Sequence, residues 1–120
     1  MKKLFVSCPI KGRTFENVCT SIKKMHQIAE IVFDEELEVI NSAWANELKE
    51  SNISDLARHI ADMGKADYFI GIEFEDHWKT CCIESYVAQK YGIKSVYVNP
   101  RDLMPDIYEV KNTELADEWL

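Results

Sequence analysis

Two loops of this sequence carry the side chains best suited to chemistry, and the first spans residues 7–13. It reads Ser7-Cys8-Pro9-Ile10-Lys11-Gly12-Arg13. Lysine and arginine side chains close to a helix N-terminus are typical of phosphate or carboxylate sites. The loop matches neither G-x-G-x-x-G nor G-x-x-x-x-G-K-[ST], and the chain has only four glycines, which argues against a dinucleotide or triphosphate cradle. On position alone, Lys11 and Arg13 are more often solvated loop cations than ligands.

The second loop, residues 73–79, contains Asp76, His77 and Trp78 and leads into a predicted helix that carries Glu84 in its opening turn. A carboxylate in a first helical turn is often only a partner for the helix dipole. Glu84, however, follows Ile83, which belongs to the predicted apolar stripe, so we expect its carboxylate to lie along the rim of the sheet. A nucleophile or a base would be well placed there, although position alone favours the dipole interpretation.

The other reactive side chains are histidines and cysteines. His59 lies in the apolar stripe of a predicted helix, where a lone histidine is usually a hydrogen-bonded core residue. His77, Cys81 and Cys82 are potential metal ligands, but adjacent cysteines point to different faces of a helix and do not easily share one ion. We therefore predict no metal site and no cofactor. The four cysteines are expected as free thiols, because none forms a C-x-x-C pair.

These residues must be positioned by strands and helices that alternate along the chain. Short apolar runs predict strands at residues 4–6, 37–40, 68–72 and 95–98. The order β-α-β-α-β-α-β favours a single domain, residues 1–120, with an open parallel sheet of the Rossmann or flavodoxin-like kind and helices on both faces. Ligands bind such sheets at the carboxyl ends of the strands. The loops after the first and third strands are therefore the candidate sites.

Apolar residues at three- and four-residue spacing predict the helices. The first follows Thr14 as N-cap and is expected to bury Phe15, Val18, Ile22, Met25, Ala29 and Val32. The second follows Ser54 as N-cap and ends at Gly64. The third runs from about residue 81 to residue 91 with Ile83, Val87 and Tyr91 inward, and Tyr86 is also expected to pack against the fold rather than to stack on a base.

Composition narrows the classes of partner. The 120 residues are 47% hydrophobic and 29% charged, with a formal net charge of −7, as in an acidic globular domain. This charge opposes binding to a nucleic-acid polymer, although two well-placed cations are enough to hold one phosphate. Residues 1–6 are too short for a signal peptide, and no apolar stretch reaches membrane-spanning length. We therefore expect a cytoplasmic protein without a membrane partner.

The first loop, together with Cys81-Cys82-Ile83-Glu84 at the start of a later helix, resembles the nucleoside 2-deoxyribosyltransferase-like superfamily, in particular its short phage and bacterial members. The resemblance implies that Glu84 is a nucleophile that attacks the anomeric carbon of a deoxynucleoside or deoxynucleotide. It also implies that the first loop binds the base, the sugar or a 5′-phosphate. We therefore assign substrate binding to Ser7, Pro9, Lys11, Gly12, Arg13, Asp76, Trp78 and Cys81.

The sequence departs from that superfamily at one catalytic position. The characterised enzymes carry an aspartate near the sugar and the leaving base, and His59 stands at the corresponding place. A histidine with an ordinary pKa of about 6.5 is able to protonate a leaving base, so we assign His59 a catalytic role. The same difference is expected in a protein that binds a nucleotide, or a nucleotide-derived signal, without cleaving it. A domain that serves protein–protein interaction is the third interpretation.

A small chain with two open loops encloses little of a ligand, whereas a ligand site buries most of its occupant. In the resembling superfamily, neighbouring subunits complete each other's sites. The tail of this chain ends in Trp119-Leu120, two apolar residues that favour burial against a partner. We therefore predict at least a homodimer.

Overall fold

The chain folds around a four-stranded sheet. The computed structural model describes residues 1–41, 53–73 and 78–107. In chain order the elements are β1 (Lys2–Val6), α1 (Phe15–Phe33), β2 (Leu37–Val39), α2 (Ile53–Met63), β3 (Tyr68–Ile72), α3 (Lys79–Lys90), β4 (Lys94–Val98) and α4 (Pro100–Leu103). The strand order is β2-β1-β3-β4, and all pairings are parallel. The predicted open parallel α/β sheet is confirmed.

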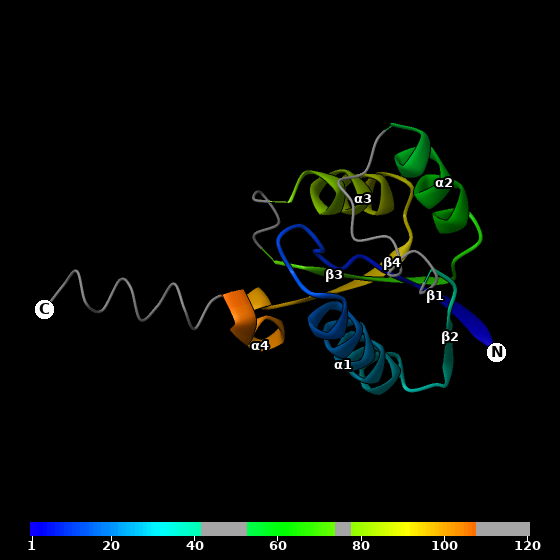
Figure 1. Cartoon of the computed structure of the whole chain (residues 1–120). Helices are drawn as coiled ribbons and strands as arrows, with labels where there is room; N and C mark the ends of the chain where they lie inside the picture. Colours follow the sequence, from blue (N-terminus) through cyan, green and yellow to red (C-terminus); the bar gives the residue numbers. More distant parts are fainter. Residues whose placement is uncertain (42–52, 74–77, 108–120) are drawn as a thin grey trace, which may run out of the picture.

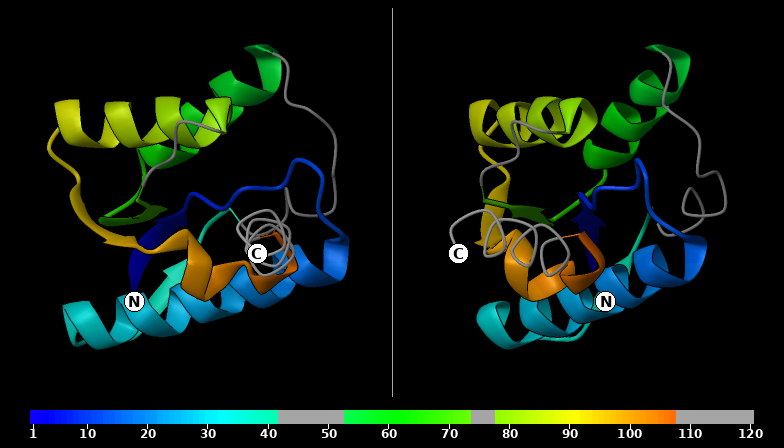
Figure 2. Two further views of the ribbon diagram at one scale, coloured as in Figure 1. Left: turned by 90° about the vertical axis from the view of Figure 1, so that its left-hand side faces the viewer. Right: turned by 60° about the vertical axis from the view of Figure 1, so that its left-hand side comes forward.

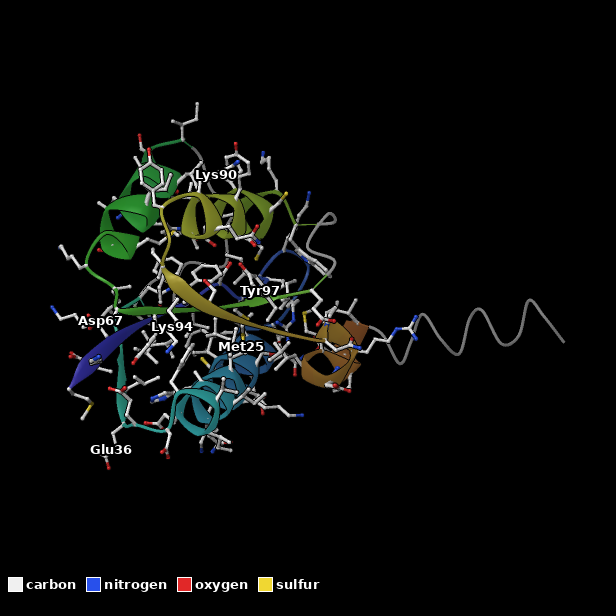
Figure 3. The ribbon with its side chains drawn as sticks, turned by 180° about the vertical axis from the view of Figure 1, so that it is seen from behind. Met25, Glu36, Asp67, Lys90, Lys94 and Tyr97 are labelled. Carbon is white, nitrogen blue, oxygen red and sulfur yellow. The ribbon has the colours of Figure 1, made fainter. Side chains whose placement is uncertain are left out.

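Helices cover both faces of the sheet, as predicted. α1 and α4 lie against one face, and α2 and α3 lie against the other (Figure 1). Figure 2 shows the same layers from two further directions. Alternate residues of β1 point to opposite faces, so that Leu4 packs in the core under α1 and Phe5 in the core under α3. Met25 of α1 and Tyr97 of β4 mark these two sides of the sheet in Figure 3.

Helix α1 confirms the predicted cap and most of the predicted stripe. The Thr14 side chain accepts a hydrogen bond from the backbone N–H of Asn17, and Val18, Ile22, Met25 and Ala29 are buried. Phe15 and Val32 are not buried, with exposed fractions of 46% and 54%. Phe33, the residue after Val32, stacks on Tyr68 of β3. The last turn of α1 therefore turns Phe33, not Val32, towards the sheet.

Helix α3 turns a partly different face to the sheet from the one predicted, and of the predicted residues Val87 packs against the core there. Its buried residues are Cys81, Glu84, Ser85 and Ala88. Tyr91 and Tyr86, both expected to pack, are 83% and 62% exposed, so this expectation was wrong. The small and polar face suits the site because the rings of Phe69 and Tyr97, 6.1 Å apart between centroids, already fill space on this side of the sheet.

The remaining differences concern the ends of elements. β1, α3 and β4 each begin one or two residues earlier than predicted, and β2 ends one residue earlier. Ser54 lies inside α2 and does not precede it. Among the described residues, no helix has the length and apolar character needed to cross a membrane.

Candidate functional site at the carboxyl ends of β1 and β3

The chain leaves β1 and β3 in opposite directions. From β1 it passes through α1 to the neighbouring β2, whereas from β3 it passes through α3 to β4 at the other edge. In open parallel sheets, such a switch point is where ligands bind. The strand order therefore places the two candidate loops at adjacent strand ends.

Ser7 and Glu84 meet at this switch point. The backbone N–H of Ser7 donates to the carbonyl oxygen of Ile70 at 2.8 Å, which holds the end of β1 against β3. The Ser7 Oγ donates to Oε1 of Glu84 at 2.8 Å. Ser7 is only 1% exposed and Glu84 only 4% exposed. The two sequence motifs, 77 positions apart, thus share a buried hydrogen bond.

His59 of α2 approaches the other oxygen of the same carboxylate. Its Nδ1 lies 3.3 Å from Oε2 of Glu84, and the His59 side chain is 12% exposed. The neighbouring Glu84 carboxylate raises the pKa of His59 above its ordinary value of 6.5, against the opposing effect of burial. The negative charges of Glu84 and Asp55 act in the same raising direction. His59 therefore faces the sheet as expected, with a carboxylate as its partner.

Glu84 lies deeper than predicted. Because α3 begins at Lys79, Glu84 sits in the second turn and in the middle of the buried face, not in the opening turn or on an exposed rim. The stabilising field of a helix N-terminus falls off within the first turn, which weakens the dipole interpretation. Removing a carboxylate from water is costly unless donors replace the water. Ser7 and His59 are placed to do so.

No family model, curated protein or solved structure matches this chain. Ser7, His59 and Glu84 therefore have to be interpreted from their own geometry. What the structure establishes is a parallel open sheet with a buried carboxylate held from two sides at the switch point.

Arg13 is buried within the protein, although it was predicted to contact substrate. Its Nε and Nη2 donate to the two carboxylate oxygens of Asp106, at 3.0 Å and 3.2 Å. Its remaining contacts are with Pro9 O, Cys8 Sγ, Asn17 O and Ser21 Oγ. Arginine has five N–H donors, and these contacts engage all three of its nitrogens. The geometry favours a structural role for Arg13 over phosphate binding.

The other predicted substrate residues differ in accessibility. Lys11 and Gly12 are exposed, and Gly12 has a φ of 75°, a conformation that glycine adopts without strain. Pro9 and Cys81 are buried. Trp78 is half-buried and packs against the core under α1. Asp76 lies outside the described residues, as does His77.

Sequence reasoning missed Asn41 and Tyr97. The side chain of Asn41, just beyond β2, is bonded to both backbone polar groups of Val6. Tyr97 Oη is bonded to Ser85 Oγ at 3.2 Å and to Gln89 Nε2 at 3.0 Å. For Asn41, an asparagine immediately after a strand at the binding edge is a usable signal. The contacts of Tyr97 became visible only when the buried face of α3 was known.

Gly71 makes space for aromatic side chains between the sheet and α3. A Cβ at this position would lie 2.8 Å from Cε1 of Phe69 and 3.2 Å from Cε1 of Tyr97. Contacts this short require the two rings to move. Glycine therefore leaves room for the two aromatic side chains over β3, in the core below α3.

Metal-binding residues do not gather in the described parts of the chain: no group of three histidine, cysteine, aspartate or glutamate side chains has the geometry to hold an ion. All four cysteines are free thiols, as predicted. Burial raises the pKa of the Cys8 thiol to about 11, so this thiol stays protonated and is a poor nucleophile at neutral pH.

A shallow surface hollow lies at the opposite edge of the sheet, where α1 ends. It is lined by Gln27, Glu30, Ile31, Asp34, Glu35 and Glu36. Two of its carboxylates already have partners: Glu30 accepts from the Leu37 N–H, and Glu35 accepts from the Tyr68 hydroxyl. These contacts tie α1 to the sheet.

Proposed function

We propose that this protein breaks the N-glycosidic bond of a deoxynucleoside or a deoxynucleoside monophosphate, with Glu84 as the nucleophile. The observation that carries the proposal is the 2.8 Å hydrogen bond between Ser7 and Glu84. These residues belong to the two motifs that resemble the nucleoside 2-deoxyribosyltransferase-like superfamily. Motifs that form one catalytic site have to meet in space, and these two do so at the ligand-binding edge of the sheet.

The reaction proceeds by two displacements at the anomeric carbon. The Glu84 carboxylate attacks C1′, the bond from C1′ to the base nitrogen breaks with its electron pair leaving on the base, and the base takes up a proton. An ester joins Glu84 to the sugar. A second base or water then attacks C1′ and gives up a proton, while the ester bond breaks and restores the carboxylate. Attack by a second base gives base exchange, and attack by water gives hydrolysis. Both routes retain the configuration at C1′.

His59 is assigned the proton transfer to the leaving base. Its raised pKa keeps it protonated over a wider range of pH than an ordinary histidine, and a departing base anion requires a proton donor. Among the cations of the first loop, exposed Lys11 is better placed than Arg13 to receive a 5′-phosphate, because the Arg13 guanidinium is engaged by protein acceptors.

One observation favours a binding protein as the second candidate. Both oxygens of Glu84 have protein partners, and the residue is only 4% exposed. Each carboxylate oxygen keeps a second lone pair, but a residue this buried reaches C1′ only after displacement of side chains that cover it. A protein that only holds a nucleotide, or a nucleotide-derived signal, has no need for that displacement.

The deciding experiment is incubation with a panel of deoxynucleosides and deoxynucleoside monophosphates, with and without an acceptor base, followed by chromatography of the bases. Glu84→Gln should abolish base release or exchange. Glu36→Gln is the matched control, because Glu36 is exposed and precedes β2 at the opposite end of the strands, and it should leave turnover unchanged. Calorimetric binding without released base would support the binding protein. If the protein neither binds nor cleaves any compound of the panel, both proposed functions are overturned.

We also propose that two copies of the chain share the site. The support is the small size of one chain relative to a ligand enclosure, together with the shared sites of the resembling superfamily. Trp119 and Leu120 lie outside the described residues. Light scattering should give a mass of at least two chains. A monomeric mass with ligand binding retained would contradict this arrangement.

A further inference from the structure

Asn41 ties the end of β1 to the chain beyond β2. Its Oδ1 accepts a hydrogen bond from the Val6 N–H at 2.9 Å, and its Nδ2 donates to the Val6 carbonyl oxygen at 2.7 Å. The residue is only 3% exposed. Both polar groups of the Asn41 amide are thus used on a single backbone residue, the one that precedes Ser7.

These two bonds extend the pairing of β1 and β2 past the end of the shorter strand. The register stops at Leu4↔Val39, and the Ile40 N–H still donates to the Leu4 carbonyl oxygen at 3.0 Å. Beyond that point the Asn41 side chain replaces backbone partners. On the other side of β1, the Ser7 N–H is bonded to Ile70 of β3. The end of β1 is therefore held from both sides where Ser7 begins.

We propose that Asn41 is a positioning residue that fixes the carboxylate of Glu84 through Val6 and Ser7. The Ser7 Oγ reaches Glu84 Oε1 at 2.8 Å, and its position depends on the strand end that Asn41 holds. The effect on catalysis rests on the proposed function of Glu84. The positioning itself is a property of the fold and is measurable without a substrate.

The chain offers a matched control at the opposite end of the same strand. Asp67 Oδ2 accepts a hydrogen bond from the Lys3 N–H at 2.8 Å. The Asp67 side chain therefore also holds the β1 backbone. It does so at Lys3, which lies four residues before Ser7 at the amino edge of the sheet. A general loosening of β1 follows from either loss, whereas displacement of Ser7 follows only from the loss of Asn41.

The test uses the His59 imidazole as the reporter, titrated by NMR in the full-length chain. Glu84 raises the pKa of His59, so a carboxylate that is no longer held should let this pKa fall towards 6.5. We expect the fall in Asn41→Ala and in Ser7→Ala, and no further fall in the double variant, because both residues act on the same contact. Asp67→Ala should leave the titration unchanged. Asn41→Ser, which retains one polar group, serves if Asn41→Ala does not fold.

Kinetics give the second readout. If Glu84 is the nucleophile, Asn41→Ala should lower kcat by about 10- to 100-fold with KM little changed, since misplacement of a reacting group by about 1 Å costs of this order. An unchanged or raised pKa of His59 in the Asn41 variant, or additive effects with Ser7→Ala, would overturn the positioning role. Wild-type protein that releases no base would overturn the proposed function and leave the titration to decide the role of Asn41.

Discussion

Arg13 and Asp106 form a two-point ion pair between the loop after β1 and the chain just beyond α4. The pair spans 93 positions of sequence, and the side chains are 0% and 19% exposed. A bidentate contact fixes orientation as well as distance. Ser21 strengthens the connection, because its hydroxyl accepts from Arg13 at 2.7 Å and donates to the Leu103 carbonyl oxygen at 2.9 Å. The candidate ligand loop is thereby anchored to α1 and α4.

Removal of Arg13 should destabilise the fold. We expect Arg13→Ala to lower the free energy of unfolding by about 3–5 kcal/mol, because it leaves a largely buried carboxylate and several acceptors without their donor. Urea denaturation measures the loss. The matched control is Arg58→Ala on the surface of α2, where the ion pair with Asp55 should be worth less than about 1 kcal/mol. Equal losses in the two variants would contradict a structural role for Arg13.

The loss of stability on substitution of Glu84 should depend on the replacement, whereas turnover should fall with either replacement. Glu84→Ala removes the partner of both Ser7 and His59 and should cost about 1–3 kcal/mol. Glu84→Gln keeps an acceptor for Ser7 and should cost less. Both should reduce base release at least about a thousandfold if Glu84 is the nucleophile. Thermal unfolding and a base-release assay on the same samples separate the two effects, and full turnover in folded Glu84→Gln would rule out the nucleophile.

The contact between His59 and Glu84 should make stability depend on pH. The pKa of His59 is raised in the folded protein, so the protonated form stabilises the fold. This contribution is fully present below the unfolded-state pKa of about 6.5 and is lost as the pH rises through the folded-state pKa. In urea denaturation the difference between wild type and His59→Gln should shrink over that window. A constant difference for His59→Gln would argue against a charged pair.

Lys11 should discriminate phosphorylated from unphosphorylated ligands. Lys11→Ala is expected to weaken binding of a deoxynucleoside monophosphate much more than binding of the matching nucleoside, because a charge-assisted contact to phosphate is lost. Calorimetric titration of both ligands gives the comparison. Lys65→Ala, an exposed lysine between α2 and β3, is the control. Losses of the same size for both ligands would show that the loop does not read phosphate.

The strands and the first helix were predictable because local pattern determines them. Tyr68–Ile72 is apolar on both faces, as a strand covered on each side requires, and every residue of β3 is buried. The stripe through Val18 and Met25 repeats with the period of a helix and is buried as predicted. Thr14 caps α1 through a bond to a residue three positions away. Each of these features depends only on near neighbours in the chain.

The burial of the polar residues was not predictable in the same way. Glu84 and Arg13 were placed at a rim and in a solvated loop, because charged side chains are rarely buried without a partner. Their partners lie 77 and 93 positions away in the sequence, and no local sequence pattern indicates these contacts. For α3, the apolar residues suggested one inward face, whereas the large rings from the sheet favoured the face with Ser85 and Ala88.

The strand order also has a consequence for the sequence of events in folding. β1, α1 and β2 form one unit within the first 41 residues, including the bonds of Asn41 to Val6, so this unit is able to assemble while the rest of the chain is still being synthesised. We expect Glu84 to join it after β3 has paired with β1, because that pairing has a much larger sequence separation and forms more slowly. We therefore expect the polar centre to be among the last parts of the molecule to become ordered, with Ser7 already in position to receive the carboxylate.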